Sequence, residues 1–480
     1  MLRFLRKPVA LLLACLLVAE PIALAQELPD FGSPADSVLS KAREKMLGRS
    51  VILQLRNAGV IVDDPLLNEY IGLLGSQLAS QVNDGDFDFE FFVIDDDSIN
   101  AFAMPGGVIG VHTGLLLATE NESELAGVMA HEVSHVTQRH IARSIYDRQR
   151  TSILSMAAVL AAALLGASGG NGDVAMGAAA AAQAAAVQQQ INFTRANEYE
   201  ADRIGMGVLS RSGFDPIGMA SFFEKLGRRE SRSADVIPEL LRTHPTSNDR
   251  ISEARARARQ LPRTNHVDSL GYGLAKARIR VLSARTPETA EAYYRLLADS
   301  TDPADRYGYA LSLSVTGRHD QAERIFRALG TENPSVIAYR IGRAEALMAA
   351  GLDEQAMAVY AEANALSPRN VPLVISYGEA LIVSGKAAEA HAVLLDLLNN
   401  VDPAPAQIEL LARAANAEGD IINAHHYMSE YYASIGNLPL AIAQLNMALE
   451  APGLNSVQRA RFNARIDEFE EYLAEAERRG

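Results

Sequence analysis

The stretch that decides the fold of the first half of the chain is His131-Glu132-Val133-Ser134-His135. On a helix His131 and His135 share one face, because they lie four residues apart, so both imidazoles can bind one ion. Glu132 is the next residue along and is placed to take a proton from a water molecule beside that ion. The stretch therefore predicts a metal-dependent hydrolytic site on a helix.

The segments around this stretch predict a mainly helical domain with a small sheet. A helix is expected from Asn121 to about Tyr146, because asparagine caps helices and a glutamate follows three residues on. Residues 33–81 also have helical periodicity. Alternating apolar residues over 87–93 predict one strand, and 108–112, after a Pro-Gly-Gly turn, predict a second. The fold class expected for this half is α+β.

Two histidines do not complete a metal site, and the residues leave three candidates for the third ligand. His140 follows His135 by five residues, which turns it away from the shared face of a continuous helix. Glu198 and Glu200 lie on a second predicted helix, and spacing alone does not choose between them. Asp202 shares a face with Glu198 and is expected to accept a hydrogen bond from the outer nitrogen of a ligand imidazole.

The first 25 residues are predicted to be an export signal. Three basic residues precede the apolar run 9–18, and Ala23-Leu24-Ala25 follows, so cleavage is expected before Gln26. A rival interpretation takes Cys15 as a lipoprotein site, but the cut would then fall inside the apolar run. Cys15 is the only cysteine, so the mature chain has no thiolate ligand. With histidine and carboxylate ligands, the expected cofactor is one zinc ion per chain.

The C-terminal part of the chain repeats every 34 residues. A glycine marks the turn of each unit, an alanine follows five residues later, and a small residue precedes it by seven. These residues are Gly317, Gly351, Gly385 and Gly419; Ala322, Ala356, Ala390 and Ala424; Ala310, Ala344, Gly378 and Ala412. The pattern predicts helix-turn-helix units whose helices touch at the small residues. It resembles the tetratricopeptide repeat family, which implies an all-α solenoid that binds protein partners.

Length, charge and composition limit the remaining possibilities. A chain of 480 residues exceeds one ordinary domain, and the expected division is a signal peptide at 1–25, a protease domain at 26–265 and a repeat domain at 266–480. The net charge of −15 argues against nucleic acid as a partner. The alanine-rich segment 151–186 is too short in each half to span a membrane, so a helical hairpin is favoured over contact with the membrane interface.

The whole set of motifs resembles the gluzincin peptidases related to the CaaX prenyl protease and the HtpX heat-shock protease. The resemblance is carried by His131-Glu132-x-x-His135 with Glu198-x-x-x-Asp202, by residues 100–107, and by Thr243-His244-Pro245 followed by Arg250-Ile251. It implies that His131, His135 and Glu198 bind zinc and that Glu132 is the general base. It also implies that His244 lies near the metal, where it steadies an oxyanion or reversibly occupies the water site.

With the repeats and the export signal, the resemblance is to the periplasmic branch of these peptidases that serves outer-membrane β-barrel assembly. It implies an endopeptidase, also chaperone-like, that degrades unfolded or misassembled outer-membrane proteins. An edge strand near Val108 would hold the substrate extended, and the repeats would dock on the assembly machinery. Membrane contact would be peripheral at most. The alternative is a repeat-based chaperone or scaffold with gated or minor proteolysis.

Overall fold

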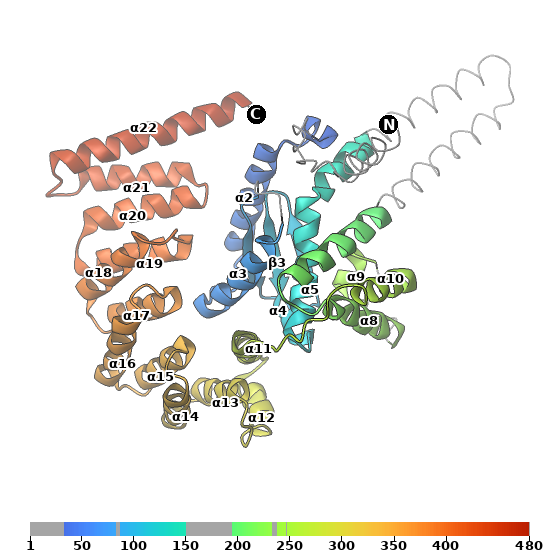
Figure 1. Ribbon diagram of the computed structural model, residues 1–480. Helices are drawn as coiled ribbons and strands as arrows, with labels where there is room; N and C mark the ends of the chain where they lie inside the picture. The colour runs from blue at the N-terminus through green and yellow to red at the C-terminus, as the bar shows by residue number, and fades with distance from the viewer. Residues whose placement is uncertain (1–32, 83–86, 150–193, 233–237, 246, 480) are drawn as a thin grey trace, which may run out of the picture.

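The computed structural model describes residues 33–82, 87–149, 194–232, 238–245 and 247–479. Within these ranges the chain is mostly helical with one three-stranded sheet, and a curved array of helices faces the part that carries the sheet (Figure 1). The expected α+β fold followed by an all-α array is confirmed. The predicted signal peptide and the alanine-rich segment 151–186 lie outside the described residues.

The first part of the chain packs helices around the sheet. Its labelled elements are η1 (Pro34–Ser37), α2 (Lys41–Asn57), α3 (Pro65–Ala79), β1 (Glu90–Ile94), β2 (Ala101–Met104), β3 (Val108–His112), α4 (Thr113–Ala118), α5 (Glu122–Thr137), α8 (Ile217–Arg232), α9 (Glu239–Thr243) and α10 (Asn248–Ala258). Residues 140–149 and 194–211 are also helical. One hydrophobic core joins α3, α5, the helix 194–211 and α8, so α5 lies inside the domain.

The strand order β1-β3-β2 corrects one expectation about the sheet. The strand that begins at Val108 is β3, which is fully buried between its two neighbours and is not an edge. Strand β3 pairs parallel with β1 and antiparallel with β2. The antiparallel pairing follows from the tight turn at Gly106 and Gly107, both with positive φ, which joins β2 directly to β3. The two edge strands are β2 (Ala101–Met104), whose outer edge has no strand partner in the described part of the chain, and β1, whose outer edge carries a bridge between Ile94 and Ile61.

The helix predicted from Asn121 to Tyr146 is interrupted, which is a second correction. Helix α5 ends at Thr137, and a new helical stretch starts at His140. Between them Arg139 adopts φ 51°, a left-handed conformation that an arginine rarely adopts. The buried guanidinium of Arg139 donates to the Leu39 carbonyl and pairs with Asp36 and Glu44. These contacts compensate for the strain and hold the break in place.

The repeat array consists of antiparallel helices joined by short turns. Its helices are α11 (Leu270–Leu282), α12 (Pro287–Arg295), α13 (Pro303–Val315), α14 (His319–Glu332), α15 (Ile337–Ala349), α16 (Asp353–Leu366), α17 (Val371–Val383), α18 (Ala387–Leu398), α19 (Pro405–Glu418), α20 (Ile421–Ser434), α21 (Leu438–Glu450) and α22 (Ser456–Arg479). Gly317, Gly351, Gly385 and Gly419 all have positive φ in turns between two helices. At Gly378 an added Cβ would lie 2.9 Å from the Leu394 side chain, so the small residues do mark helix contacts.

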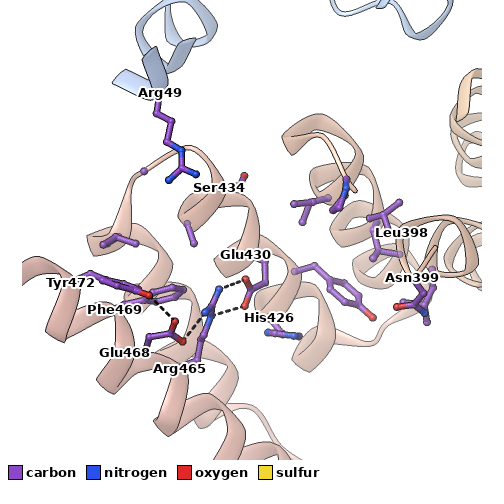
Figure 2. A pocket seen from close by; sticks show the side chains of 18 residues that line it. Arg49, Leu398, Asn399, His426, Glu430, Ser434, Arg465, Glu468, Phe469 and Tyr472 are labelled. Atoms are coloured by element: carbon purple, nitrogen blue, oxygen red, sulfur yellow. Dashed lines mark hydrogen bonds and ion pairs between the residues drawn. The ribbon is translucent and has the colours of Figure 1, made fainter. Parts of the chain in front are cut away.

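The concave side of the array faces α2 and α3 of the first part (Figure 1). Asn370 of the array donates a hydrogen bond to Glu69 of α3 at 3.4 Å, and Leu53 of α2 lies next to the turn at Gly436. A cavity of about 870 Å³ opens there, lined by side chains of α18–α22 and by Arg49 of α2. Figure 2 shows Arg465 on its wall, joined to Glu430 and Glu468.

The segment 262–269 connects the two parts and is tied to the start of α5. The carboxylate of Glu122, the first residue of α5, accepts hydrogen bonds from Tyr70 and from the Ser269 backbone and hydroxyl. The ring of His266 lies 3.0 Å from the same carboxylate. In the ranges that the structure describes, none of the helices combines the length and apolar character needed to cross a membrane.

Candidate metal centre

Two helices meet at the predicted site because a glycine lets their backbones approach closely. Helix α5 carries His131 and His135, and the helix 194–211 crosses it. A Cβ added at Gly205 would lie 2.9 Å from the Ala130 carbonyl oxygen and 3.1 Å from the His131 Cα. With no side chain at that position, Glu198 reaches the histidines.

Four side chains converge on one point. The Nε2 atoms of His131 and His135 are 3.0 Å apart, and they lie 3.4 and 3.5 Å from the Glu198 carboxylate oxygens. His244, just after α9, places its Nδ1 3.3 Å from His131 Nε2 and 3.1 Å from Glu198 Oε1. These residues form a group that could bind a metal ion. Side chains predicted from three distant parts of the sequence are therefore brought together.

The spacing of these four atoms fits a tetrahedral zinc ion. Ligand atoms about 2.0–2.1 Å from zinc in a tetrahedron lie about 3.3 Å from one another. The observed separations of 3.0 to 3.5 Å are on both sides of that value. Two imidazoles and a carboxylate are also the donor types that catalytic zinc sites use, with the fourth position left for water. In this structure the fourth atom is Nδ1 of His244.

Glu132 lies beside the cluster, on the side toward the sheet. It is almost fully buried, and its Oε1 lies 3.6 Å from His244 Nε2. Burial raises the pKa of the Glu132 carboxyl, while the two nearby histidines and a backbone hydrogen bond from Ala103 of β2 oppose that shift. A raised pKa strengthens the carboxylate as a base. Glu132 therefore lies between the cluster and the open edge of the sheet.

Asp202 contacts the outer ring nitrogen of His131, and Arg250 in turn binds Asp202. Asp202 Oδ1 lies 2.9 Å from His131 Nδ1, the ring nitrogen that points away from the cluster. The buried Arg250 donates two hydrogen bonds of 2.8 Å to Asp202, one of 2.7 Å to the Pro245 carbonyl, and lies 3.0 Å from Glu198. Burial alone would raise the pKa of Asp202, but hydrogen bonds with His131 and Arg250 hold it below its usual value.

The sequence gives no local signal for the place of Arg250 in the site. Arg250 belongs to a segment similar to one in related peptidases, but nothing local in the sequence places an arginine on α10 against two carboxylates 48 and 52 positions earlier. His140 was expected to point away from the site, yet its ring lies against His135. Both residues are brought there by tertiary contacts. The one hint in the sequence is the proximity of Arg250 to His244.

Comparison with known proteins finds peptidase relatives for this chain. Residues 65–258 match the model of peptidase family M48. The β-barrel assembly-enhancing protease of Escherichia coli is 35% identical over 93% of this chain and 91% of its own length. The enzyme of the same name from Yersinia pestis is 37% identical over 68% of this chain and 70% of its own, and the E. coli metalloprotease LoiP is 27% identical over 46% and 82%.

The fold and the cluster of His131, His135, Glu198 and His244 define a metallopeptidase with an M48 domain and a helical repeat array. At the identity and coverage above, the chain belongs to the family of β-barrel assembly-enhancing proteases. Among solved structures, a tetratricopeptide repeat protein from Parabacteroides merdae is 14% identical over 59% of this chain and 96% of its own, with a TM-score of 0.28. The assignment of the repeats rests on the paired antiparallel helices and their glycine turns described above.

Proposed function

We propose that this chain is a zinc-dependent endopeptidase in which His131, His135 and Glu198 hold one zinc ion. The observation that carries the proposal is the convergence of these three ligands, with Glu132 next to them, at tetrahedral spacing. A zinc ion held there would activate water and polarise the scissile carbonyl. Glu132 would take the proton from the attacking water and deliver it to the leaving amine. Asp202 would orient His131.

The substrate side of the proposal rests on the open edge of β2. In the part of the chain that the structure describes, β2 pairs only with β3, and Ala103 on it touches Glu132. An extended peptide that adds to this edge would pass directly beside the general base. We propose strand addition here, in place of the strand near Val108. Such a mode selects unfolded segments, because folded proteins keep their strands paired.

The relatives are named for β-barrel assembly, which supports β-barrel proteins of the outer membrane as substrates. We propose that unfolded or misassembled outer-membrane proteins are degraded, and that the repeats bind them or the β-barrel assembly machinery. The cavity on α18–α22 supports this role, since it combines an apolar lining with charged and aromatic side chains (Figure 2). Export to the periplasm, with cleavage before Gln26 and domains at 26–265 and 266–480, rests on the sequence patterns described above.

His244 supports a second candidate, a chaperone or scaffold whose proteolysis is gated. Its Nδ1 lies among the ligand atoms, where water would be needed for hydrolysis. We propose that His244 closes the resting site and must move away before a peptide is cut. A gated enzyme would bind partners through its repeats most of the time and cut rarely.

The test compares the mature wild type with Glu132→Gln and His244→Ala, each with its bound zinc measured, on an unfolded outer-membrane barrel protein. The expected result is about one zinc in all three, cleavage only where Glu132 is present, and faster cleavage by His244→Ala. Zinc in all three with no cleavage by wild type or His244→Ala would favour the chaperone role. Zinc absent from the wild type would refute the proposed metal site.

A further inference from the structure

The ring of His135 is held by a partner different from the one that holds His131. The outer nitrogen of His131 faces the carboxylate of Asp202. The outer nitrogen of His135, Nδ1, instead lies 2.9 Å from Nδ1 of His140, whose side chain is buried. An imidazole can accept a hydrogen bond at one ring nitrogen only if it is neutral and carries its proton on the other. The state of His140 therefore matters for His135.

The state of His140 is set by Glu200. His140 Nε2 lies 3.3 Å from Glu200 Oε2, and Arg143 donates to the same oxygen at 2.9 Å. An ionised carboxylate can only accept, so His140 carries a proton on Nε2, and in the neutral ring its Nδ1 then bears a lone pair. That lone pair can accept only if His135 carries its own proton on Nδ1. The lone pair of His135 is then on Nε2, the atom that faces the other ligands.

The fold builds this arrangement from two features already described. The break at Arg139 starts a new helix at His140 and turns its ring back toward His135, which a continuous helix would not do. On the helix 194–211, Glu198 and Glu200 are two residues apart and point in different directions. Glu198 faces the ligand cluster while Glu200 faces His140.

We propose that Glu200, acting through His140, fixes the ring orientation and the protonated nitrogen of His135 and so sets the affinity of the site for its metal. This inference rests on the proposed zinc site. His140 and Glu200 are positioning residues, because neither lies among the four ligand atoms. Removing an outer hydrogen-bond partner of a metal-bound histidine weakens metal binding by about 10–100-fold.

The experiment measures the zinc affinity of the full mature chain by competition with a chromophoric chelator. His140→Met removes the acceptor, while His140→Asn keeps a carbonyl oxygen close to the position of Nδ1, where it can accept from His135. Glu200→Met removes the oxygen that accepts from His140 Nε2, so the proton of His140 is no longer held on that nitrogen. His112→Met is the control, since His112 is another buried histidine and its contacts are with Ser98, Asp96 and Phe102. Circular dichroism verifies that each variant folds.

The expected result is a loss of about 10–100-fold in zinc affinity for His140→Met and a loss in the same direction for Glu200→Met. His140→Asn should recover most of the loss, and His112→Met should bind zinc as the wild type does. Wild-type affinity in His140→Met, or equal losses in His140→Met and His140→Asn with none in Glu200→Met, would overturn this inference alone. A wild type that binds no zinc overturns the proposed function and this inference with it.

Discussion

Replacing Arg250 by methionine should destabilise the metal-free chain by about 3–5 kcal/mol, because it leaves buried charges without their partner. The guanidinium is almost completely buried and makes two hydrogen bonds of 2.8 Å to Asp202. It also lies 3.0 Å from Glu198, so two buried carboxylates depend on it. Methionine keeps most of the apolar stem and removes only the charge and its donors.

The loss should be smaller when zinc is bound. A zinc ion would place a second positive charge next to Glu198, so the carboxylates would be partly compensated without Arg250. In the metal-free chain, about 3–5 kcal/mol corresponds to a fall of roughly 6–20 °C in the melting temperature of a domain of this size. Differential scanning calorimetry with a chelator, and then with excess zinc, measures both values.

Arg465→Met is the matched control for this prediction. Arg465 makes a similar two-pronged contact with Glu430, at 3.1 and 2.7 Å, but its side chain is 33% exposed. An exposed pair of this kind contributes at most about 1 kcal/mol. If Arg250→Met costs no more than Arg465→Met in the metal-free chain, the argument that burial makes Arg250 essential is wrong.

Three further predictions concern other parts of the chain. Burial lowers the pKa of His426 from 6.5 to about 4. Between these pH values the folded chain binds fewer protons than the unfolded chain, so the free energy of unfolding should fall by about 2 kcal/mol on going from pH 7 to pH 5. His426→Gln should abolish most of this fall, as measured in thermal melts. Glu122→Gln should cost about 1.5–3 kcal/mol and speed proteolytic cleavage within 262–269, whereas an unchanged cleavage rate would show that the contacts do not restrain this segment. Gly351→Ala should cost about 1–2 kcal/mol from its positive φ alone, while Gly72→Ala, in the open middle of α3, should be neutral or stabilising by chemical denaturation.

The sequence by itself determined the local elements and their faces. His131 and His135 share a face because four residues make about one helical turn, and Glu198 shares a face with Asp202 for the same reason. The 34-residue period predicted the turns of the repeats, since each glycine is needed where the backbone has a positive φ. These features depend on periodicity and on backbone conformation, which neighbouring residues decide.

Only the tertiary structure decided which distant residues complete the site. Glu198 lies closer than Glu200 to the cluster because Gly205 fixes how the two helices cross. Arg250 and His140 reach the site through contacts with residues far away in the chain, and in the case of His140 through a helix break that Asp36 and Glu44 stabilise. Strand pairing likewise decides that β2 lies at an edge of the sheet. Such contacts join positions whose separation along the chain carries no periodic signal, so their geometry exists only once the chain is folded.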